Sequence, residues 1–280
     1  MSDTLSKDEL YKETFSRNTS GILTEAEQDI LRNSTVAVAG SGGGGGISAE
    51  RIARLGVGGI KLADPEVFDH SNKNRQFGCT TSVFGKKKAV EVGKILQDIN
   101  PELKVDIFPD GLTKSNIDEF LDGADILVEE VEGYFFKIRA LVYSAARAKG
   151  IYAVRADTFG FCSPLFVFDP NGMTFEQFFE LPPIDEIPDD MADASHVYIE
   201  KFLLGKRAPA GYPEEHLAKM TKKEKPFSCL SFGCSLIGTL TCSEVVKILL
   251  NKGERVVAPK VMNVDLYNRT IEVVDFSDHC

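Results

Sequence analysis

Short apolar runs alternate with longer amphipathic stretches along the chain. The apolar runs, rich in β-branched residues, predict buried strands over 35–40, 59–64, 103–109 and 124–132, and a strand pair over 151–170. The amphipathic stretches between them predict helices over 47–56, 87–100, 116–123 and 134–150. Strands that alternate with helices are typical of an α/β protein with a doubly wound, mostly parallel sheet.

The pattern changes on both sides of this core. The start of the chain is mainly helical by pattern, and "TEAE" at Thr24–Glu27 has capping-box spacing. An acidic, proline-rich stretch and a basic run predict an inserted loop with one or two helices, "HVYIEKFLLGK" and "PEEHLAKM". A helix over 238–253 and strands over 261–268 and 270–276 follow. The expected parts are an N-terminal helical arm (1–33), a Rossmann-like core (34–170), a variable insertion or crossover loop (171–226) and a C-terminal helix and strands that complete the core (227–280).

Composition and charge limit the classes of function. The formal net charge of −10 argues against nonspecific nucleic-acid binding, because such binding requires a basic surface. No apolar run approaches the roughly 20 residues of a membrane span, and the polar start "MSDTLSKDELYKE" lacks the apolar centre of a secretory signal. Neither cysteines nor histidines show zinc-ligand spacing. We therefore expect a cytoplasmic protein that binds neither nucleic acid nor membrane and has no structural zinc.

The segment "GSGGGGGIS", Gly40–Ser48, follows the first predicted strand and indicates a phosphate-binding turn. Read as G-x-G-x-x-G, it uses Gly40, Gly42 and Gly45, with Gly43 beside them, where bare backbone can turn tightly and approach a phosphate. The following helix directs its positive N-terminus at the same group. Asp64, at the end of the second strand, is placed to bind ribose hydroxyls. The pattern predicts a nucleotide site, with a flexible glycine loop as the alternative. Proteins that bind nicotinamide and flavin cofactors share the pattern, so it leaves the kind of nucleotide open.

The loop after Asp64 favours a triphosphate over a dinucleotide. Its stretch "DPEVFDHSNKNRQF" contains Asn72, Arg75 and Gln76, and a guanidinium there suits the charged β- and γ-phosphates. Lys86–Lys88 follow at the start of a helix, where the helix dipole disfavours cations. Three cations at a helix N-terminus are explained either by a bound anion or by solvation of the side chains. Arg75 upstream favours the bound anion.

These residues, in one register, resemble the ThiF/MoeB/HesA family, bacterial relatives of the ubiquitin-activating enzymes. The resemblance runs from about residue 15 to 168 and resumes at "GTLTCSEVVKILL" and "NVDLYNRTIEV". It implies an adenylyltransferase that uses ATP and Mg²⁺, in which a carboxylate attacks the α-phosphate and pyrophosphate leaves. It further implies residue roles: ribose binding by Asp64, a phosphate path lined by Asn72, Arg75 and Gln76, and neutralisation of transition-state charge by Lys88.

The resemblance also covers the arm and the end of the fourth strand. "FSRN" is similar to a tyrosine-serine-arginine-glutamine stretch of the family, which implies that Arg17 reaches the ATP site of a neighbouring subunit in a homodimer. "EEVEG" stands where the family has an aspartate followed by asparagine. Glu132 then takes the place of the magnesium-binding aspartate, Gly133 that of the asparagine, and Glu129 that of an upstream aspartate. The metal-binding carboxylate is therefore one methylene longer.

The family's paired Cys-x-x-Cys motifs are missing, and the insertion carries no cysteine that could become acylated. Cys162, Cys229 and Cys234 are possible substitutes, with a buried structural cysteine as the commoner alternative. The phenylalanines of "MTFEQFF" and "YFFK" are expected to be packing residues.

The sequence favours adenylation of the C-terminus of a small ubiquitin-like carrier protein, of a peptide or of a small acid, and does not distinguish among these. Two other classes stay open. A noncatalytic nucleotide-binding scaffold is motivated by the glutamates of "EEVEG". An oxidoreductase that uses NAD or FAD would give no role to Arg75 and Lys88.

Overall fold

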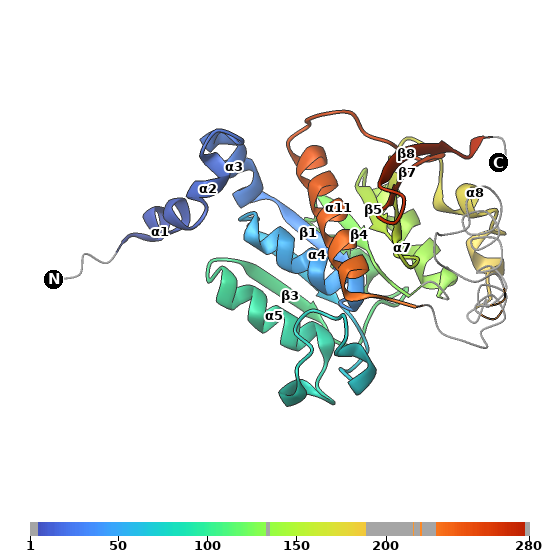
Figure 1. Ribbon diagram of the computed structural model, residues 1–280, viewed down its shortest axis with the longest axis horizontal. Helices are drawn as coiled ribbons and strands as arrows, with labels where there is room; N and C mark the ends of the chain where they lie inside the picture. The colour runs from blue at the N-terminus through green and yellow to red at the C-terminus, as the bar shows by residue number, and fades with distance from the viewer. Residues whose placement is uncertain (1–4, 133–134, 189–214, 216–218, 220–227, 278–280) are drawn as a thin grey trace.

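The computed structural model describes residues 5–132, 135–188, 215, 219 and 228–277. In this part of the chain one sheet contains eight strands in the order β3-β2-β1-β4-β5-β6-β7-β8 (Figure 1). The strands are β1 Thr35–Ala39, β2 Gly59–Ala63, β3 Lys104–Phe108, β4 Ile126–Glu129, β5 Tyr152–Ala156, β6 Cys162–Phe168, β7 Lys260–Asp265 and β8 Thr270–Asp275. Strands β1–β5 pair in parallel and β6–β8 are antiparallel. The predicted doubly wound, mostly parallel sheet is confirmed.

Helices cover both faces of this sheet. They are α4 Gly43–Arg54, α5 Lys88–Ile99, α6 Ile117–Leu121, α7 Phe136–Ala148, α8 Phe175–Phe179 and α11 Ser231–Leu249. Successive strand residues point to opposite faces, so Val36 and Val38 pack with α4, α5 and α11, whereas Ala37 and Ala39 pack with α6, α7 and α8. Both faces of the central strands are therefore buried, which explains their continuous apolar runs.

The phenylalanines of α8 and the start of α7 fill the second of these two layers. Phe136, Phe175, Phe178 and Phe179 are each 2% exposed or less, and their rings contact one another. The expectation that they are packing residues is confirmed for these four, but it is wrong for Phe135 of "YFFK", which precedes α7 and is 51% exposed.

The N-terminal arm consists of α1 Lys7–Thr14, α2 Ser16–Thr19 and α3 Glu25–Asn33. The predicted capping box is present, since Thr24 Oγ1 accepts the Glu27 N–H at 3.2 Å and Glu27 accepts the Thr24 N–H at 2.8 Å. Tyr11 donates to the Gly56 carbonyl at 2.6 Å, just beyond the C-terminal end of α4. The arm projects at one end of the molecule, and β7, β8 and α8 lie toward the other end (Figure 1).

Two helices begin at least four residues earlier than predicted. Helix α4 begins at Gly43 rather than at residue 47, so most of the glycine run is helical, and α11 begins at Ser231 rather than at residue 238. Glycine lowers helix propensity in a local pattern, but tertiary packing can override it. Here α4 packs against α11, with Gly238 of α11 against Ile47 of α4. Figure 1 shows the two helices side by side. Nearly all of the predicted insertion helices lie outside the described residues.

Within the described residues α11 has the length and composition of a membrane span, with a mean hydropathy of 1.4. It also carries Glu244 and Lys247, and Ile237 and Val245 belong to the core between α4, α5 and the sheet. Packing in the core accounts for its apolar composition.

The order of the sheet reverses between β1 and β4, because β1 connects to β2 on one side and β4 lies on its other side. In doubly wound sheets, ligands bind at the carboxyl ends of the strands at such a switch point. Gly40 follows β1 at this edge with a φ of +97°, and Glu130 follows β4. The candidate site therefore lies at this edge of the sheet, at the switch point.

Candidate site at the switch point of the sheet

Asp64 connects the glycine turn to the loop after β2. Its Oδ2 accepts the Ser41 N–H at 2.7 Å and its Oδ1 accepts the Glu66 N–H at 2.8 Å, and the residue is 5% exposed. Each carboxylate oxygen has a second lone pair, so a hydroxyl donor can still bind. Asp64 thus shapes the turn and leaves acceptor capacity at the crevice.

Lys88 is the buried member of the three lysines. Its Nζ lies 2.5 Å from Glu66 Oε2, and its backbone N–H donates to the Glu66 carbonyl at 3.0 Å; the Lys88 side chain is 3% exposed. Lys87 instead donates to the Pro65 carbonyl at 2.8 Å and pairs with Asp110 at 3.3 Å, and Lys86 is exposed. The three adjacent lysines therefore have different environments.

Arg75 and Gln76 face the glycine turn. A Cβ at Gly43 would lie 3.8 Å from Arg75 Nε, and one at Gly42 would lie 3.7 Å from Gln76 Nε2. Gln76 Oε1 is buried without a hydrogen-bond partner among the described residues. Asn72 was predicted to line the phosphate path. In the structure its Oδ1 instead accepts the Asp69 N–H at 3.1 Å, within its own turn.

Glu132 belongs electrostatically to the same crevice. Desolvation raises the pKa of its carboxyl, and the neighbouring charges of Glu66 and Asp64 raise it further, while Lys88 and Arg75 oppose the change. The residues predicted from "EEVEG" and from the loop after β2 are therefore within one electrostatic field. Gly133 lies outside the described residues.

Several positions of the glycine run must be glycine because other groups of the protein leave no room for a side chain. A Cβ at Gly45 would lie 1.9 Å from the Gly40 carbonyl oxygen, and one at Gly44 would lie 2.1 Å from Glu130 Oε2. A Cβ at Gly43 would lie 2.8 Å from Cys234 Sγ of α11. The third glycine of the G-x-G-x-x-G pattern, Gly45, thus serves close packing, as the pattern predicts. Close packing of α4 against Glu130 and α11 also requires Gly44 and Gly43, which the sequence did not indicate.

The contact between Gly43 and Cys234 predicts a coupled effect on stability. We expect Gly43→Ala to lower the free energy of unfolding by about 1–3 kcal/mol, because the added methyl group overpacks the helix contact. In a Cys234→Ala background the same change should cost less, with a coupling energy of about 0.5 kcal/mol or more. Urea unfolding of the four proteins of this cycle measures the coupling, and strictly additive effects would contradict it.

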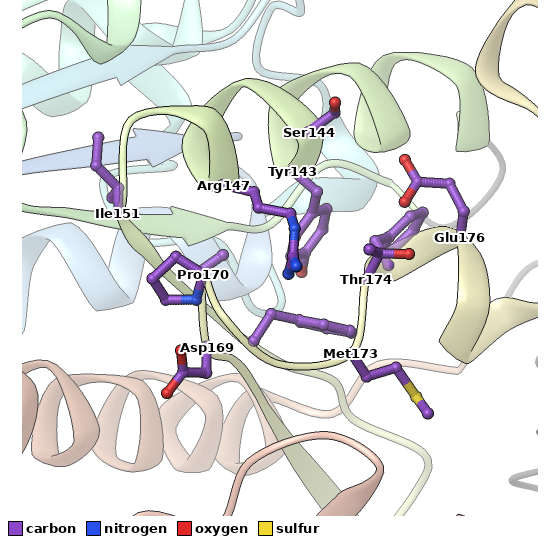
Figure 2. A pocket seen from close by; sticks show the side chains of 12 residues that line it. Tyr143, Ser144, Arg147, Ile151, Asp169, Pro170, Met173, Thr174 and Glu176 are labelled. Carbon is purple, nitrogen blue, oxygen red and sulfur yellow. The ribbon is translucent and has the colours of Figure 1, made fainter.

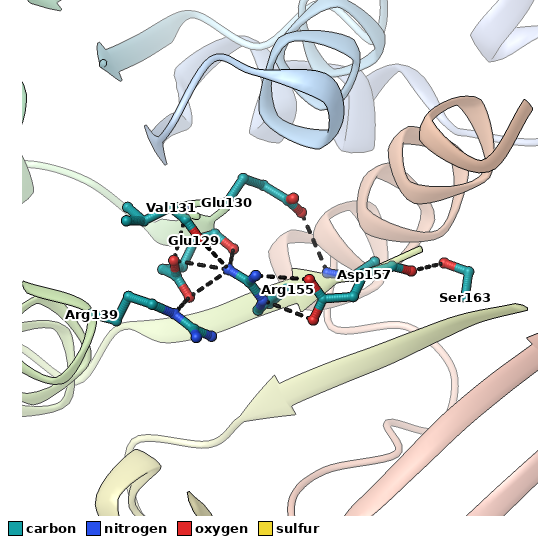
Figure 3. A network of polar contacts seen from close by, with 8 residues as sticks. Glu129, Glu130, Val131, Arg139, Arg155, Asp157 and Ser163 are labelled. Carbon is teal, nitrogen blue, oxygen red and sulfur yellow. Dashed lines mark hydrogen bonds and ion pairs between the residues drawn. The ribbon is translucent and has the colours of Figure 1, made fainter. Parts of the chain in front are cut away.

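Glu129 and Glu130 point to opposite faces of the sheet. Figure 3 shows Glu129 between Arg139 of α7 and Arg155 of β5, with ion-pair distances of 3.1 and 3.0 Å. Arg155 also binds Asp157 at 2.7 Å. All the carboxylate and guanidinium groups of this network are largely buried, and Glu129 and Arg139 are fully so. Glu129 therefore connects β4, β5 and α7 beneath the crevice.

Glu130 lies on the other face, against the glycine run. Its Oε1 accepts the Ala156 N–H at 3.3 Å, and its Oε2 lies where a side chain at Gly44 would be (Figure 3). Burial raises the pKa of the Glu130 carboxyl well above its usual 4.5; Arg155 opposes the shift, and Asp157 and Glu129 add to it. No individual role for Glu130 was predicted from the sequence. Period-two alternation after Glu129 is the signal that could have placed it on the α4 face.

The raised pKa of Glu130 predicts a pH-dependent stability. Between the unfolded pKa and the folded pKa, the folded chain holds one proton more, so the free energy of unfolding falls as the pH rises, by at most ~1.4 kcal/mol per pH unit. Glu130→Gln has no titrating group and should not show this loss. Its stability relative to the unchanged protein should therefore increase as the pH rises above the usual carboxyl pKa, as measured by urea unfolding. A difference independent of pH would contradict the assignment.

Two of the three candidate thiols lie at the crevice. Cys234 is 3% exposed, and burial raises the pKa of its thiol to about 12. Burial also raises the pKa of Cys229, an effect that the nearby Arg75 partly offsets. Cys162 is buried in β6. A high pKa leaves a thiol protonated and weakly nucleophilic at neutral pH, so the packing role is favoured for Cys234.

Arg17 does not lie at the crevice of its own chain. It is exposed on α2, and its neighbour Asn18 donates to the Leu55 carbonyl at 3.2 Å, at the C-terminal end of α4. The 12 residues of α4 span about 18 Å, and the glycine turn is at the other end of the helix. Any contact of Arg17 with this site therefore requires a second copy of the chain.

A separate pocket of about 80 Å³ lies at the amino end of β5, away from the crevice. Figure 2 shows Tyr143 and Arg147 of α7 on one side, and Met173 and Thr174 on the connection to α8 on the other. The Tyr143 hydroxyl is buried without a hydrogen-bond partner among the described residues. None of the predicted site residues lines this pocket, so it belongs to a different part of the molecule.

The fold and the crevice together define a doubly wound α/β protein with a glycine turn and clustered cations at its switch point. The chain belongs to the ThiF family, whose sequence model matches residues 15–280. It is 38% identical over 128 residues to a tRNA threonylcarbamoyladenosine dehydratase of Bacillus subtilis (strain 168), an alignment that covers 45% of this chain and 50% of that protein. It is 29% identical over 163 residues to the SAMP-activating enzyme E1 of Haloferax volcanii, covering 58% of this chain and 60% of the relative.

Solved structures share the fold. The crystal structure of E. coli MccB with ATP superposes with a TM-score of 0.68 and 17% identity, covering 97% of this chain and 72% of that one. At this identity the likeness shows the fold alone. The chain spans about half to three-fifths of the length of the two relatives above.

Proposed function

We propose that the chain is an ATP-dependent adenylyltransferase that activates a carboxylate as its acyl-adenylate. The observation that carries the proposal is the position of Asp64 and Arg75 at the glycine turn, with Lys88 connected to Asp64 through Glu66, at the switch point of the sheet. Membership of the ThiF family supports it. A dinucleotide would give no function to the buried ammonium of Lys88 or to the guanidinium beside Gly43.

Two buried polar groups favour a nucleotide triphosphate at the glycine turn. Ser41 Oγ in the turn and Gln76 Oε1 beside it lack hydrogen-bond partners among the described residues, and polar groups of a ligand would satisfy them. A Cβ at Gly42 would occupy otherwise open space beside Gln76, with no atom closer than 3.7 Å. Bare backbone and cations around such a space are suited to phosphate oxygens.

In the proposed reaction an oxygen of the substrate carboxylate attacks the α-phosphorus of ATP, the bond to the bridging oxygen breaks, and pyrophosphate leaves. Asp64 accepts hydrogen bonds from ribose hydroxyls. Arg75 and Lys88 neutralise charge on the phosphate oxygens, which is the main requirement of phosphoryl and nucleotidyl transfer. Glu132 is the carboxylate we assign to hold Mg²⁺, which would supply further charge neutralisation. The described residues contain no group of three or more His, Cys, Asp or Glu side chains that could hold a metal ion, so the phosphate oxygens of ATP would supply further ligands.

Arg17 is proposed to complete the site from a second subunit. The separation along α4 excludes a contact within one chain, and an exposed arginine on a projecting arm is suited to reach a neighbour. A guanidinium delivered in trans would add positive charge at the triphosphate. The proposal therefore includes a homodimer.

The substrate is proposed to be the C-terminus of a small ubiquitin-like carrier protein, a peptide or a small acid. The Haloferax relative is named for activating SAMP, and the Bacillus relative for acting on tRNA. The net charge of −10 favours the first kind of partner over a nucleic acid.

ATP–pyrophosphate exchange tests the proposal. The protein is assayed with carrier proteins, with peptides that end in glycine and with small carboxylic acids, and exchange that requires one of these supports adenylation. ATP binding without exchange for the whole panel would favour a noncatalytic scaffold. Purified protein that contains a bound dinucleotide would favour an oxidoreductase.

A further inference from the structure

Glu66 connects the two ends of the candidate nucleotide site. Its backbone N–H binds Asp64 at 2.8 Å, its carbonyl accepts the Lys88 N–H at 3.0 Å, and its carboxylate lies 2.5 Å from Lys88 Nζ. The Glu66 side chain is 56% exposed, whereas that of Lys88 is 3% exposed. The lysine is thus fixed in the wall of the crevice, and the glutamate is the partner that can move.

Negative groups outnumber positive ones at this point. The Glu66 carboxylate lies 2.5 Å from Lys88 Nζ, and its backbone N–H binds Asp64. The charges of Asp64, Glu66, Lys88 and Arg75 all act on the neighbouring carboxyl of Glu132. A nucleotide adds several negative charges. A phosphate oxygen that reaches Lys88 must compete with Glu66 for the same ammonium group and then lies close to its carboxylate, where like charges repel.

We propose that Glu66 makes nucleotide binding depend on magnesium: its carboxylate competes with the phosphates for Lys88 and repels ATP that carries no metal. The inference rests on the proposed function, because it concerns the same ATP site. Mg²⁺ lowers the charge of the triphosphate and so reduces both the competition and the repulsion. The residue is thereby a specificity determinant that selects Mg-ATP over free ATP.

Isothermal titration calorimetry at low ionic strength tests this inference, because screening by salt would hide the effect. ATP is titrated in the presence of Mg²⁺ and, separately, of EDTA. Glu66→Gln removes the charge but keeps an oxygen acceptor for Lys88, so the buried ammonium keeps a partner. We expect this variant to bind metal-free ATP about tenfold more tightly, with an affinity for Mg-ATP that changes by less than about threefold.

Two controls separate this effect from general electrostatics. Asp110→Asn removes a carboxylate that pairs with Lys87, the adjacent lysine, and should change neither affinity by more than about twofold. Glu66→Asp keeps the charge and should keep the preference for Mg-ATP. The melting temperature of each variant verifies that it is folded.

The outcomes distinguish the inference from the proposed function. If the unchanged protein binds ATP in neither condition, the proposed function fails, and this inference fails with it. If it binds ATP and Glu66→Gln leaves the ratio of the two affinities unchanged, only the inference is overturned. Weaker Mg-ATP binding by Glu66→Gln, with free ATP unaffected, would also overturn it, because Glu66 would then act as a metal ligand.

Discussion

Lys88→Ala is expected to lower the rate of ATP–pyrophosphate exchange by about 10²–10³-fold. The lysine side chain is 3% exposed and held against Glu66, whose backbone N–H binds Asp64, so its ammonium has a defined position in the loop after β2. A preorganised cation in a crevice of low dielectric stabilises developing phosphate charge far more than one in water does. The measurement is exchange at saturating ATP with a carboxylate that the unchanged protein uses.

Lys87→Ala is the matched control for this prediction. Lys87 is the preceding residue, but it binds the Pro65 carbonyl and Asp110 outside the crevice. We expect its exchange rate to stay within about twofold of the unchanged protein, since exposed ion pairs contribute little. Exchange by Lys88→Ala within about fivefold of the unchanged protein, with the fold retained, would remove Lys88 from the proposed mechanism.

The sequence predicted the parts of the site that local pattern determines. The glycine turn, Asp64, Arg75 and Lys88 follow strands or begin helices, and parallel strands bring their carboxyl ends to one edge of the sheet. Knowing the order of elements was therefore sufficient to place these residues in one crevice.

The partners of these residues were not predictable in the same way. Glu66 pairs with Lys88, 22 positions later, and Cys234 reaches Gly43 across two helices. Such contacts depend on the exact distance between packed elements, which a single sequence does not contain. The close approach of Glu130 and α11 to the glycine run also depends on these distances, so it was not predictable either.

Arg17 illustrates another limit. Its motif suggests a role at the ATP site, but the chain places it at the opposite end of α4. No property of one chain's sequence specifies how two copies pack. The proposed contact in trans is therefore consistent with the geometry and stays a prediction.

Glu129→Ala is expected to lower the free energy of unfolding by about 3–5 kcal/mol, the usual cost of removing one partner of a buried ion pair. Its carboxylate is fully buried and lies 3.1 Å from Arg139 and 3.0 Å from Arg155, so the substitution takes a counter-charge from two guanidinium groups. Glu129→Gln retains an acceptor and should cost less, about 1–3 kcal/mol. Urea unfolding measures both values.

Glu129→Ala should also change the backbone position of the candidate site. Glu129 Oε1 accepts the Val131 N–H at 2.8 Å, which fixes the backbone that leads to Glu132.

Asp8→Ala is the control for both effects. It removes an exposed carboxylate that pairs with Lys12 and Arg32, and should have no measurable effect on stability or exchange. If Glu129→Ala cost less than about 1 kcal/mol, the network would not be a structural support, and the arginines would have adequate other partners. A large loss of stability in Glu129→Ala, with exchange per folded molecule preserved in Glu129→Gln, would assign Glu129 a structural role and leave Glu132 as the carboxylate of the chemistry.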